Sequence, residues 1–208
     1  MKRTLFALLL VALPTLSAGQ SDVPIRRPEI RVGDSWTYRG TNMLGPGTDE
    51  YESRVSFVDD KVILLIATRK SDGKEFDSSW TRDWNPVTSY TGLMYRPPGG
   101  FFRFPLRIGD TYEWKSEMLR PRQTTVFSST TWKTKIAGWD TVEVPAGKFR
   151  AIRVEAEGVT ETFDGAAAYP TRGTLWYEPE VRRWVKHQFI FPTFTAGEEL
   201  LSFKLNED

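Results

Sequence analysis

The chain has 208 residues, of which 39% are hydrophobic and 26% are charged, and its formal net charge is +1. No basic block occurs, so the phosphate neutralisation that drives nucleic-acid binding is missing, and we expect no nucleic-acid partner. Cysteine is absent, which excludes disulfides and the attachment of a lipid to a cysteine.

The N-terminal segment has the pattern of a secretory signal peptide. "MKR" is basic, "TLFALLLVALPTL" at 4–16 is apolar, and "SAG" at 17–19 supplies the small residues that signal peptidase needs. The apolar stretch is shorter than the roughly 20 residues of a transmembrane helix, so we expect no integral membrane segment in the mature chain. The sequence therefore predicts a signal peptide over 1–19 and a single β domain over 20–208. The expected location is the periplasm, with secretion as the alternative.

Two stretches share a motif, "IRVGDSWTYRG" at 30–40 and "LRIGDTYEWKS" at 106–116. Glycine allows a positive φ, and the neighbouring aspartate can accept a backbone hydrogen bond in a turn. The aromatic residues two positions apart then lie on one face of a strand. We interpret the motif as a turn that starts a strand rather than as a reactive site, because no base lies near Ser35 or Thr111.

Strands and turns dominate the first half of the remaining chain. Alternation, β-branched residues and an Asp-Gly turn predict a three-stranded meander over 50–80. "DWNPVTSYTGLMYRPPGGFFRFP" at 83–105 holds Pro-Pro and Gly-Gly pairs, which cannot sit inside a helix or a central strand. It predicts an irregular connector with one short strand near 88–95.

The second half predicts longer strands. These are expected within 110–118, 123–144, 149–158, 173–191 and 198–206. A tight turn is expected at "VPAGKF", and a hairpin turn at Pro179 and Glu180. No stretch favours a helix. The pattern indicates an all-β domain of about eleven or twelve strands, either an antiparallel sandwich or a curved, partly closed barrel.

Three blocks carry a family resemblance: "FPLRIGDTYEW" (104–114), "IAGWDTVEVPAGKFRAIRVEAEG" (136–158) and "LWYEPEVRRWVKHQ" (175–188). With the upstream "DWNPV", their order and spacing resemble a family of uncharacterised exported β-proteins of Gram-negative bacteria, grouped as a domain of unknown function. The resemblance covers roughly residues 80–190. It implies a periplasmic, single-domain, antiparallel β protein, and it implies no activity.

The sequence gives little indication of catalytic or metal-binding residues. The single histidine, His187, cannot form a typical zinc site without further histidines or cysteines, and we expect it to be a partly exposed strand residue. Glu155 and Glu157 share one strand face, and we expect this face to be exposed to solvent rather than to carry the acidic pair of a glycosidase. We therefore predict no catalytic residue, no metal and no cofactor.

The aromatic residues, 8 Trp, 7 Tyr and 13 Phe, are the unusual feature. Many gather with proline and glycine in 78–104, where a loop cannot easily bury them all. Aromatic side chains close to polar groups are typical of ligand surfaces. The candidate ligand-binding residues are Trp80, Trp84, Tyr90, Met94, Tyr95 and Phe101. The alternative, which needs no ligand, is a lid packed across an open end of the sheet.

Three functional hypotheses follow. The first is a non-enzymatic periplasmic binding or accessory protein that holds an apolar or amphipathic ligand, or a partner segment, in a sheet concavity. The second is a structural or envelope-assembly protein that binds an envelope protein through an unpaired edge or apolar patch and has no cavity. The third is a carboxylate-dependent hydrolase, which needs two acidic side chains converging in a pocket. No oligomeric state is predicted.

Overall fold

The computed structural model describes residues 23–123, 125–163 and 167–207, so the predicted signal peptide lies outside the described residues. The described secondary structure consists of strands, and no helix of the length and apolar character of a membrane span occurs within it. The strands are β1 (Ser35–Thr41), β2 (Thr48–Val58), β3 (Val62–Arg69), β4 (Glu75–Thr81), β5 (Pro86–Thr88), β6 (Met94–Arg96), β7 (Thr111–Leu119), β8 (Val126–Val144), β9 (Gly147–Thr162), β10 (Ala168–Glu178), β11 (Arg183–Ile190) and β12 (Thr195–Lys204).

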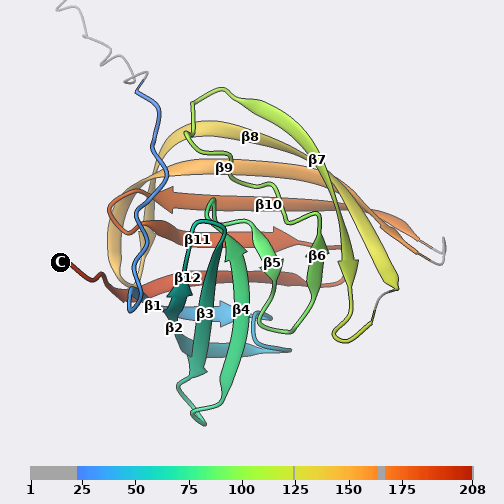
Figure 1. Cartoon of the computed structure of the whole chain (residues 1–208). Helices are drawn as coiled ribbons and strands as arrows, with labels where there is room; N and C mark the ends of the chain where they lie inside the picture. The colour runs from blue at the N-terminus through green and yellow to red at the C-terminus, as the bar shows by residue number, and fades with distance from the viewer. Residues whose placement is uncertain (1–22, 124, 164–166, 208) are drawn as a thin grey trace, which may run out of the picture.

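The strands form a closed antiparallel barrel (Figure 1). Each strand pairs with the strands before and after it in the chain, and β1 pairs with both β2 and β12, which closes the ring. The prediction of an all-β antiparallel fold with eleven or twelve strands is confirmed. Of the two architectures left open, the barrel is the one found, and its pairing closes completely. Closure removes the unpaired edges that an open sheet would expose.

The predicted turns are found where the sequence placed them. The meander over 50–80 is β2, β3 and β4, and the turn after Val144 joins β8 to β9 with Val144 paired to Gly147. The connector over 83–105 differs in detail, because it holds two three-residue strands, β5 and β6, instead of one strand near 88–95. Proline and glycine cut the pairing short: β5 and β6 share the single pair Thr88 and Met94.

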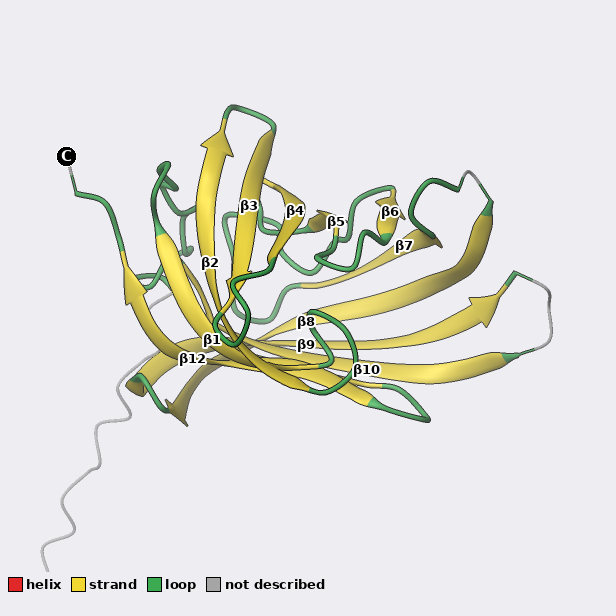
Figure 2. Cartoon of the chain, turned by 90° about the horizontal axis from the view of Figure 1, so that it is seen from below, coloured by secondary structure: helices red, strands yellow, loops and turns green. Residues whose placement is uncertain are grey.

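The barrel has two different ends. Because the strands alternate in direction, the loops after β1, β3, β5, β7, β9 and β11 gather at one end, which we call the mouth. The loops after the even-numbered strands form the opposite end, the base. Figure 2 shows β2 and β3 pointing away from the long strands β8, β9 and β10, with the short β5 and β6 between the two groups. The strands therefore spread apart away from the region where they cross.

Alternation along each strand sets the interior. On β9, Ile152, Val154 and Ala156 are fully buried, while Glu157 is exposed. Buried hydroxyls on the same inward rows pair across the strands, as Thr130 Oγ1 and Thr160 Oγ1 do at 2.8 Å. Polar groups inside the barrel are thus hydrogen-bonded where possible, as burial requires.

The two glycine motifs build the same turn at the base. Gly33 N donates to Val55 O at 2.9 Å, and Val55 N donates back to Asp34 O at 2.9 Å. In the second copy, Gly109 N donates to Ile136 O at 2.8 Å, and Ile136 N donates to the carbonyl of the next residue at 2.9 Å. Both glycines have positive φ, +90° and +92°. The interpretation as a strand-starting turn is confirmed.

Alanine at the two glycines separates backbone strain from steric clash. A Cβ at Gly109 meets no atom within 4 Å, so Gly109→Ala should cost only the positive-φ penalty, about 1–2 kcal/mol. A Cβ at Gly33 would lie 2.4 Å from Asn206 Nδ2, so Gly33→Ala should cost more. Urea unfolding of both variants measures the difference. Equal losses would contradict the role given to the Asn206 contact.

Candidate functional site

A cavity of about 390 Å³ lies inside the barrel and reaches the mouth. The mouth side is lined by Met43, Leu93 and Phe194, and the inner side by aromatic rings that include Trp84 and Trp184. The lining is mostly apolar, and the volume lies within the range of about 300–1,000 Å³ that is typical of small-molecule sites. We call this space the barrel cavity.

Five of the six predicted ligand-binding residues line the barrel cavity. They are Trp80 on β4, Trp84 in the turn after it, Tyr90 between β5 and β6, Tyr95 on β6, and Phe101 in the connector to β7. The sixth, Met94, is half-buried on β6 and does not belong to the lining. The structure thus brings most of the set to one space, and binding by these residues stays a prediction.

Trp84 sits on a strained backbone with its side chain buried. Its φ is +58°, a left-handed conformation that is rare for a bulky residue. The indole is 1% exposed, and its Nε1 donates to Arg182 O at 2.8 Å. The indole also packs edge-on against Trp36 and Trp184, with ring centroids 5.6 and 5.8 Å apart. Strain of this kind persists only where the surroundings fix it, and it concentrates at functional sites.

A buried arginine lies at the centre of these rings. Arg183 is fully buried, and its guanidinium carbon lies 4.4 Å from the ring centroid of Trp184 and 5.0 Å from that of Trp84. Three further rings surround it at 5.1–5.8 Å, those of Trp36, Tyr38 and Trp80. Desolvated cation–π contacts of this kind are each worth about 2 kcal/mol. The aromatic cluster therefore holds a cation rather than a purely apolar core.

Arg183 interacts with two polar side chains of the cluster, Ser53 and Tyr90. Its Nη1 donates to Ser53 Oγ at 3.0 Å, and Ser53 Oγ lies 2.6 Å from Tyr90 Oη. Its Nε and Nη2 have no hydrogen-bond partner among the described residues. Since Tyr90 lines the barrel cavity, this chain connects the buried cation to the cavity wall.

The charge that balances Arg183 belongs to Glu198 on β12, which is 3% exposed. Its carboxylate accepts hydrogen bonds from Tyr51 Oη and Trp184 Nε1, and His187 Nε2 lies 3.3 Å from its Oε1. Burial alone would raise the pKa of Glu198, but the contacts with His187, Arg183 and Tyr51 outweigh burial and lower the pKa to about 2. Glu198 is therefore ionised at neutral pH inside the barrel.

Two unpaired polar atoms belong to residues that line the barrel cavity. His187 Nδ1 and Ser128 Oγ are buried and have no hydrogen-bond partner among the described residues. Buried polar atoms are nearly always paired in proteins, so each such atom calls for an explanation.

The prediction for His187 is wrong. The residue is 4% exposed and not partly exposed, because the face of β11 that carries it points into the barrel. A register shift beside Val185 lets Arg183 and Trp184, which are adjacent in the chain, both be buried. The carboxylate on the neighbouring strand β12 supplies the polar partner that makes a buried imidazole acceptable.

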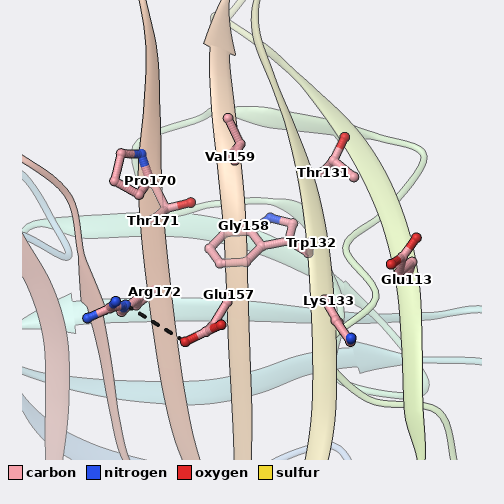
Figure 3. A pocket seen from close by; sticks show the side chains of 10 residues that line it. All are labelled: Glu113, Thr131, Trp132, Lys133, Glu157, Gly158, Val159, Pro170, Thr171 and Arg172. Carbon is pink, nitrogen blue, oxygen red and sulfur yellow. Dashed lines mark ion pairs between the residues drawn. The ribbon is translucent and has the colours of Figure 1, made fainter.

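A second, shallow depression lies on the outer face of the long strands β7 to β10 (Figure 3). Four charged residues of alternating sign surround it, Glu113, Lys133, Glu157 and Arg172. The ion pair of Arg172 Nε with Glu157 Oε1 spans 3.9 Å between highly exposed side chains, so it adds little stability. The solvated face predicted for Glu155 and Glu157 is the outer face of β9.

Neither an acidic pair in the lining of the barrel cavity nor a metal-binding cluster occurs among the described residues. No aspartate or glutamate belongs to the lining of the barrel cavity as described. Within the same part of the chain, no three His, Cys, Asp or Glu side chains gather closely enough to hold a metal ion.

Comparisons with known proteins concern the fold. No family model matches the chain and no curated protein does, so the resemblance to a domain of unknown function stays a prediction. The fold is similar to that of a protein from Parabacteroides distasonis ATCC 8503 described as a candidate lipoprotein. The TM-score is 0.51 and the identity 12%, and the match covers 88% of this chain and 100% of that one. At this identity the likeness shows the fold alone.

A second solved structure comes from Bacteroides fragilis NCTC 9343 and is described as a candidate exported protein with a YmcC-like fold. Its TM-score is 0.43 and its identity 13%, with 88% of this chain and 100% of that one covered.

Sequence reasoning missed the buried charged cluster. Tyr51 on β2 lies far along the chain from Arg183 on β11 and Glu198 on β12, and nothing local marks the three as neighbours. One signal was present: His187 alternates with Val185 and Phe189, an apolar row of the kind that faces a core.

Proposed function

We propose that this chain is a non-enzymatic, exported binding protein that holds an apolar or amphipathic small molecule in the barrel cavity. The observation that carries the proposal is the cavity itself, which is mostly apolar and open at the mouth. Apolar pockets with few polar groups are typical of sites that bind such ligands. Five of the residues predicted from sequence, among them Trp84 and Phe101, lie in its wall.

Export to the periplasm is part of the same proposal. It rests on the signal-peptide pattern of residues 1–19. The Parabacteroides protein, whose fold is similar, is described as a candidate lipoprotein, a class of exported proteins, and this description agrees with the proposal.

Two features favour binding over the other hypotheses. An interaction protein acting through an unpaired edge would leave a strand unpaired, whereas all twelve named strands belong to the closed ring. A carboxylate-dependent hydrolase needs two acidic groups in a pocket, and the described lining of the cavity is free of them.

Filling the cavity tests the proposal. Ala196 is a half-buried lining residue on β12, so Ala196→Trp places an indole in the space a ligand would occupy. We expect the wild type to bind the apolar fluorophore N-phenyl-1-naphthylamine with enhanced emission, and Ala196→Trp to lose at least about tenfold in affinity. Overpacking should cost at most about 1–3 kcal/mol, so the variant should remain folded.

The control is Ala168→Trp, an exposed position on β10 that does not line the cavity. It should bind the fluorophore as the wild type does. Circular dichroism melting of both variants separates lost binding from lost folding. Equal binding by a folded Ala196→Trp and the wild type would refute the cavity as the site. Native mass spectrometry of wild type purified from the periplasm without detergent would then identify any ligand held elsewhere.

A further inference from the structure

The mouth of the barrel carries exposed apolar side chains. Phe163, the first residue of the loop after β9, is 67% exposed. Ile190 at the end of β11 is 47% exposed, and Phe194 in the loop after it is 49% exposed. Single exposed apolar residues are ordinary on a protein surface, whereas several of them beside an opening are typical of an interaction surface. We call these three residues the mouth patch.

The mouth patch is continuous with the wall of the barrel cavity. Phe194 is at once exposed and a lining residue, and its ring stacks on that of Phe191, also a lining residue, with centroids 4.4 Å apart. At the turn after β9, Phe163 N donates to the carbonyl of Phe127, a third lining residue, at 2.9 Å. An apolar molecule at the mouth can therefore pass from the rings of the wall to exposed apolar side chains.

Basic residues lie beside the apolar ones. The guanidinium carbon of Arg120, in the loop after β7, lies 5.3 Å from the ring centroid of Phe127, whose carbonyl accepts from Phe163. Arg122 follows in the same loop, and Figure 1 shows the turns after β7 and β9 at the same end of the barrel. By sequence, the six mouth loops hold four basic residues, Lys70, Lys74, Arg120 and Arg122, and two acidic residues, Asp72 and Asp164. These loops therefore carry a net positive charge.

The base differs from the mouth in both respects. Val32, Phe57, Leu64 and Phe203 are exposed there, but none of them belongs to the lining of the barrel cavity as described. The connections after β2, β4, β6, β8 and β10 hold five basic and five acidic residues, so their charges cancel. A negatively charged partner that exchanges molecules with the cavity is therefore expected at the mouth and not at the base.

We propose that the mouth patch docks on a bilayer that contains anionic phospholipids. Phe163, Ile190 and Phe194 enter the headgroup region, and the two arginines of the loop after β7 contact lipid phosphates. Apolar side chains combined with basic ones bind such surfaces through buried apolar area and charge attraction. Three side chains at strand ends do not by themselves supply the roughly 800 Å² per partner of a stable protein interface, whereas a bilayer accepts single side chains.

The inference extends the proposed function, because docking opens the barrel cavity toward the phase in which an apolar ligand dissolves. Sedimentation with lipid vesicles tests it on the chain without its predicted signal peptide. We expect partitioning into vesicles of phosphatidylcholine with phosphatidylglycerol to exceed partitioning into phosphatidylcholine alone by at least about tenfold, since each basic residue near the surface adds about fivefold. High salt should weaken this preference, because it screens exposed charges.

Two variants remove the two parts of the docking surface. Phe163→Ser combined with Ile190→Ser should lower partitioning into the mixed vesicles by at least about tenfold, the effect of losing the burial of about one large apolar side chain. Neither residue lines the barrel cavity, so without vesicles this variant should bind N-phenyl-1-naphthylamine as the wild type does. Arg120→Gln combined with Arg122→Gln, at exposed positions, should lower the preference for phosphatidylglycerol and decides the question if the first pair does not fold.

The matched control is Phe57→Ser combined with Phe203→Ser, because these side chains are 46% and 42% exposed at the base. It should sediment with the vesicles as the wild type does. Absence of wild-type binding to either vesicle, or equal losses in folded mouth and base variants, overturns the docking surface. A dimer in vesicle-free sedimentation velocity that Phe163→Ser with Ile190→Ser dissociates would instead assign the patch to a second copy of the chain. Fluorophore binding is measured separately, so each of these outcomes leaves the proposed function standing.

Discussion

Glu198→Gln should destabilise the protein by about 3–5 kcal/mol. Removing one partner of a buried charge pair leaves the other charge buried without compensation, and losses of this size are typical. Here the uncompensated group is the guanidinium of Arg183, which is fully buried. Among the described carboxylates, Glu198 is the one whose charge acts on this guanidinium. Glutamine keeps the shape of the side chain, so packing changes little.

The matched control lies next to it on β12. Glu199 faces outward and pairs with Lys186, and both side chains are about a third exposed. Exposed ion pairs contribute about 0–1 kcal/mol, so Glu199→Gln should lose no more than that. Urea unfolding monitored by circular dichroism gives both values. Losses of equal size would show that the buried carboxylate does not balance a charge.

A second variant identifies the charge that Glu198 balances. Arg183→Met in the Glu198→Gln background removes the uncompensated cation, and a buried ion pair can often be replaced by apolar residues at little cost. We expect the double variant to be more stable than Glu198→Gln alone. If the double variant instead lost as much stability as the two single variants together, the loss would come from packing and not from the uncompensated charge.

The same carboxylate predicts a pH dependence. The pKa of Glu198 is lowered to about 2 in the folded protein, against roughly 4.3 in an unfolded chain. Its contribution to stability is therefore fully present above about pH 5 and falls away as the pH drops toward 2, because the unfolded state takes up the proton first. The stability difference between wild type and Glu198→Gln should shrink over that range in acid titrations of the free energy of unfolding.

The sequence was sufficient to predict the strands and the shared turn. Alternation and β-branched residues locate a strand without reference to its neighbours, and the Gly-Asp motif acts through hydrogen bonds made within a few residues and to one adjacent strand. Gly33 and Gly109 could be assigned a structural role for that reason. Trp84 and Phe101 could be singled out because aromatic residues amid proline and glycine are unusual.

The charged cluster could not be predicted in the same way. A charged residue that alternates with apolar ones usually faces water, and Arg183 and Glu198 depart from that rule only because each offsets the charge of the other. Their strands, β11 and β12, become neighbours through a hairpin, but Tyr51 comes from β2 and joins them only when the ring closes. Ring closure is a property of all twelve strands together and leaves no local mark.

Trp36→Ala tests how far the aromatic cluster and the cation depend on each other. Trp36 is fully buried at the first strand-starting turn, its Nε1 donates to Val181 O at 2.9 Å, and its ring contacts Trp84 and Arg183. Replacing a buried tryptophan with alanine typically costs about 3–5 kcal/mol, through lost burial and the cavity left behind. Against a total stability of about 5–15 kcal/mol, this is a large fraction.

The second copy of the motif provides the comparison for Trp36→Ala. Tyr112 occupies the equivalent position, but it is only half-buried, and the guanidinium carbon of Arg103 lies 4.2 Å from the centroid of its ring. Tyr112→Ala should therefore cost about 1–2 kcal/mol, within the ordinary range of single substitutions. Unfolding in urea followed by far-ultraviolet circular dichroism avoids the fluorescence change that loss of a tryptophan causes. If the two losses were equal, the cost would come from the shared turn and not from the cluster around Arg183.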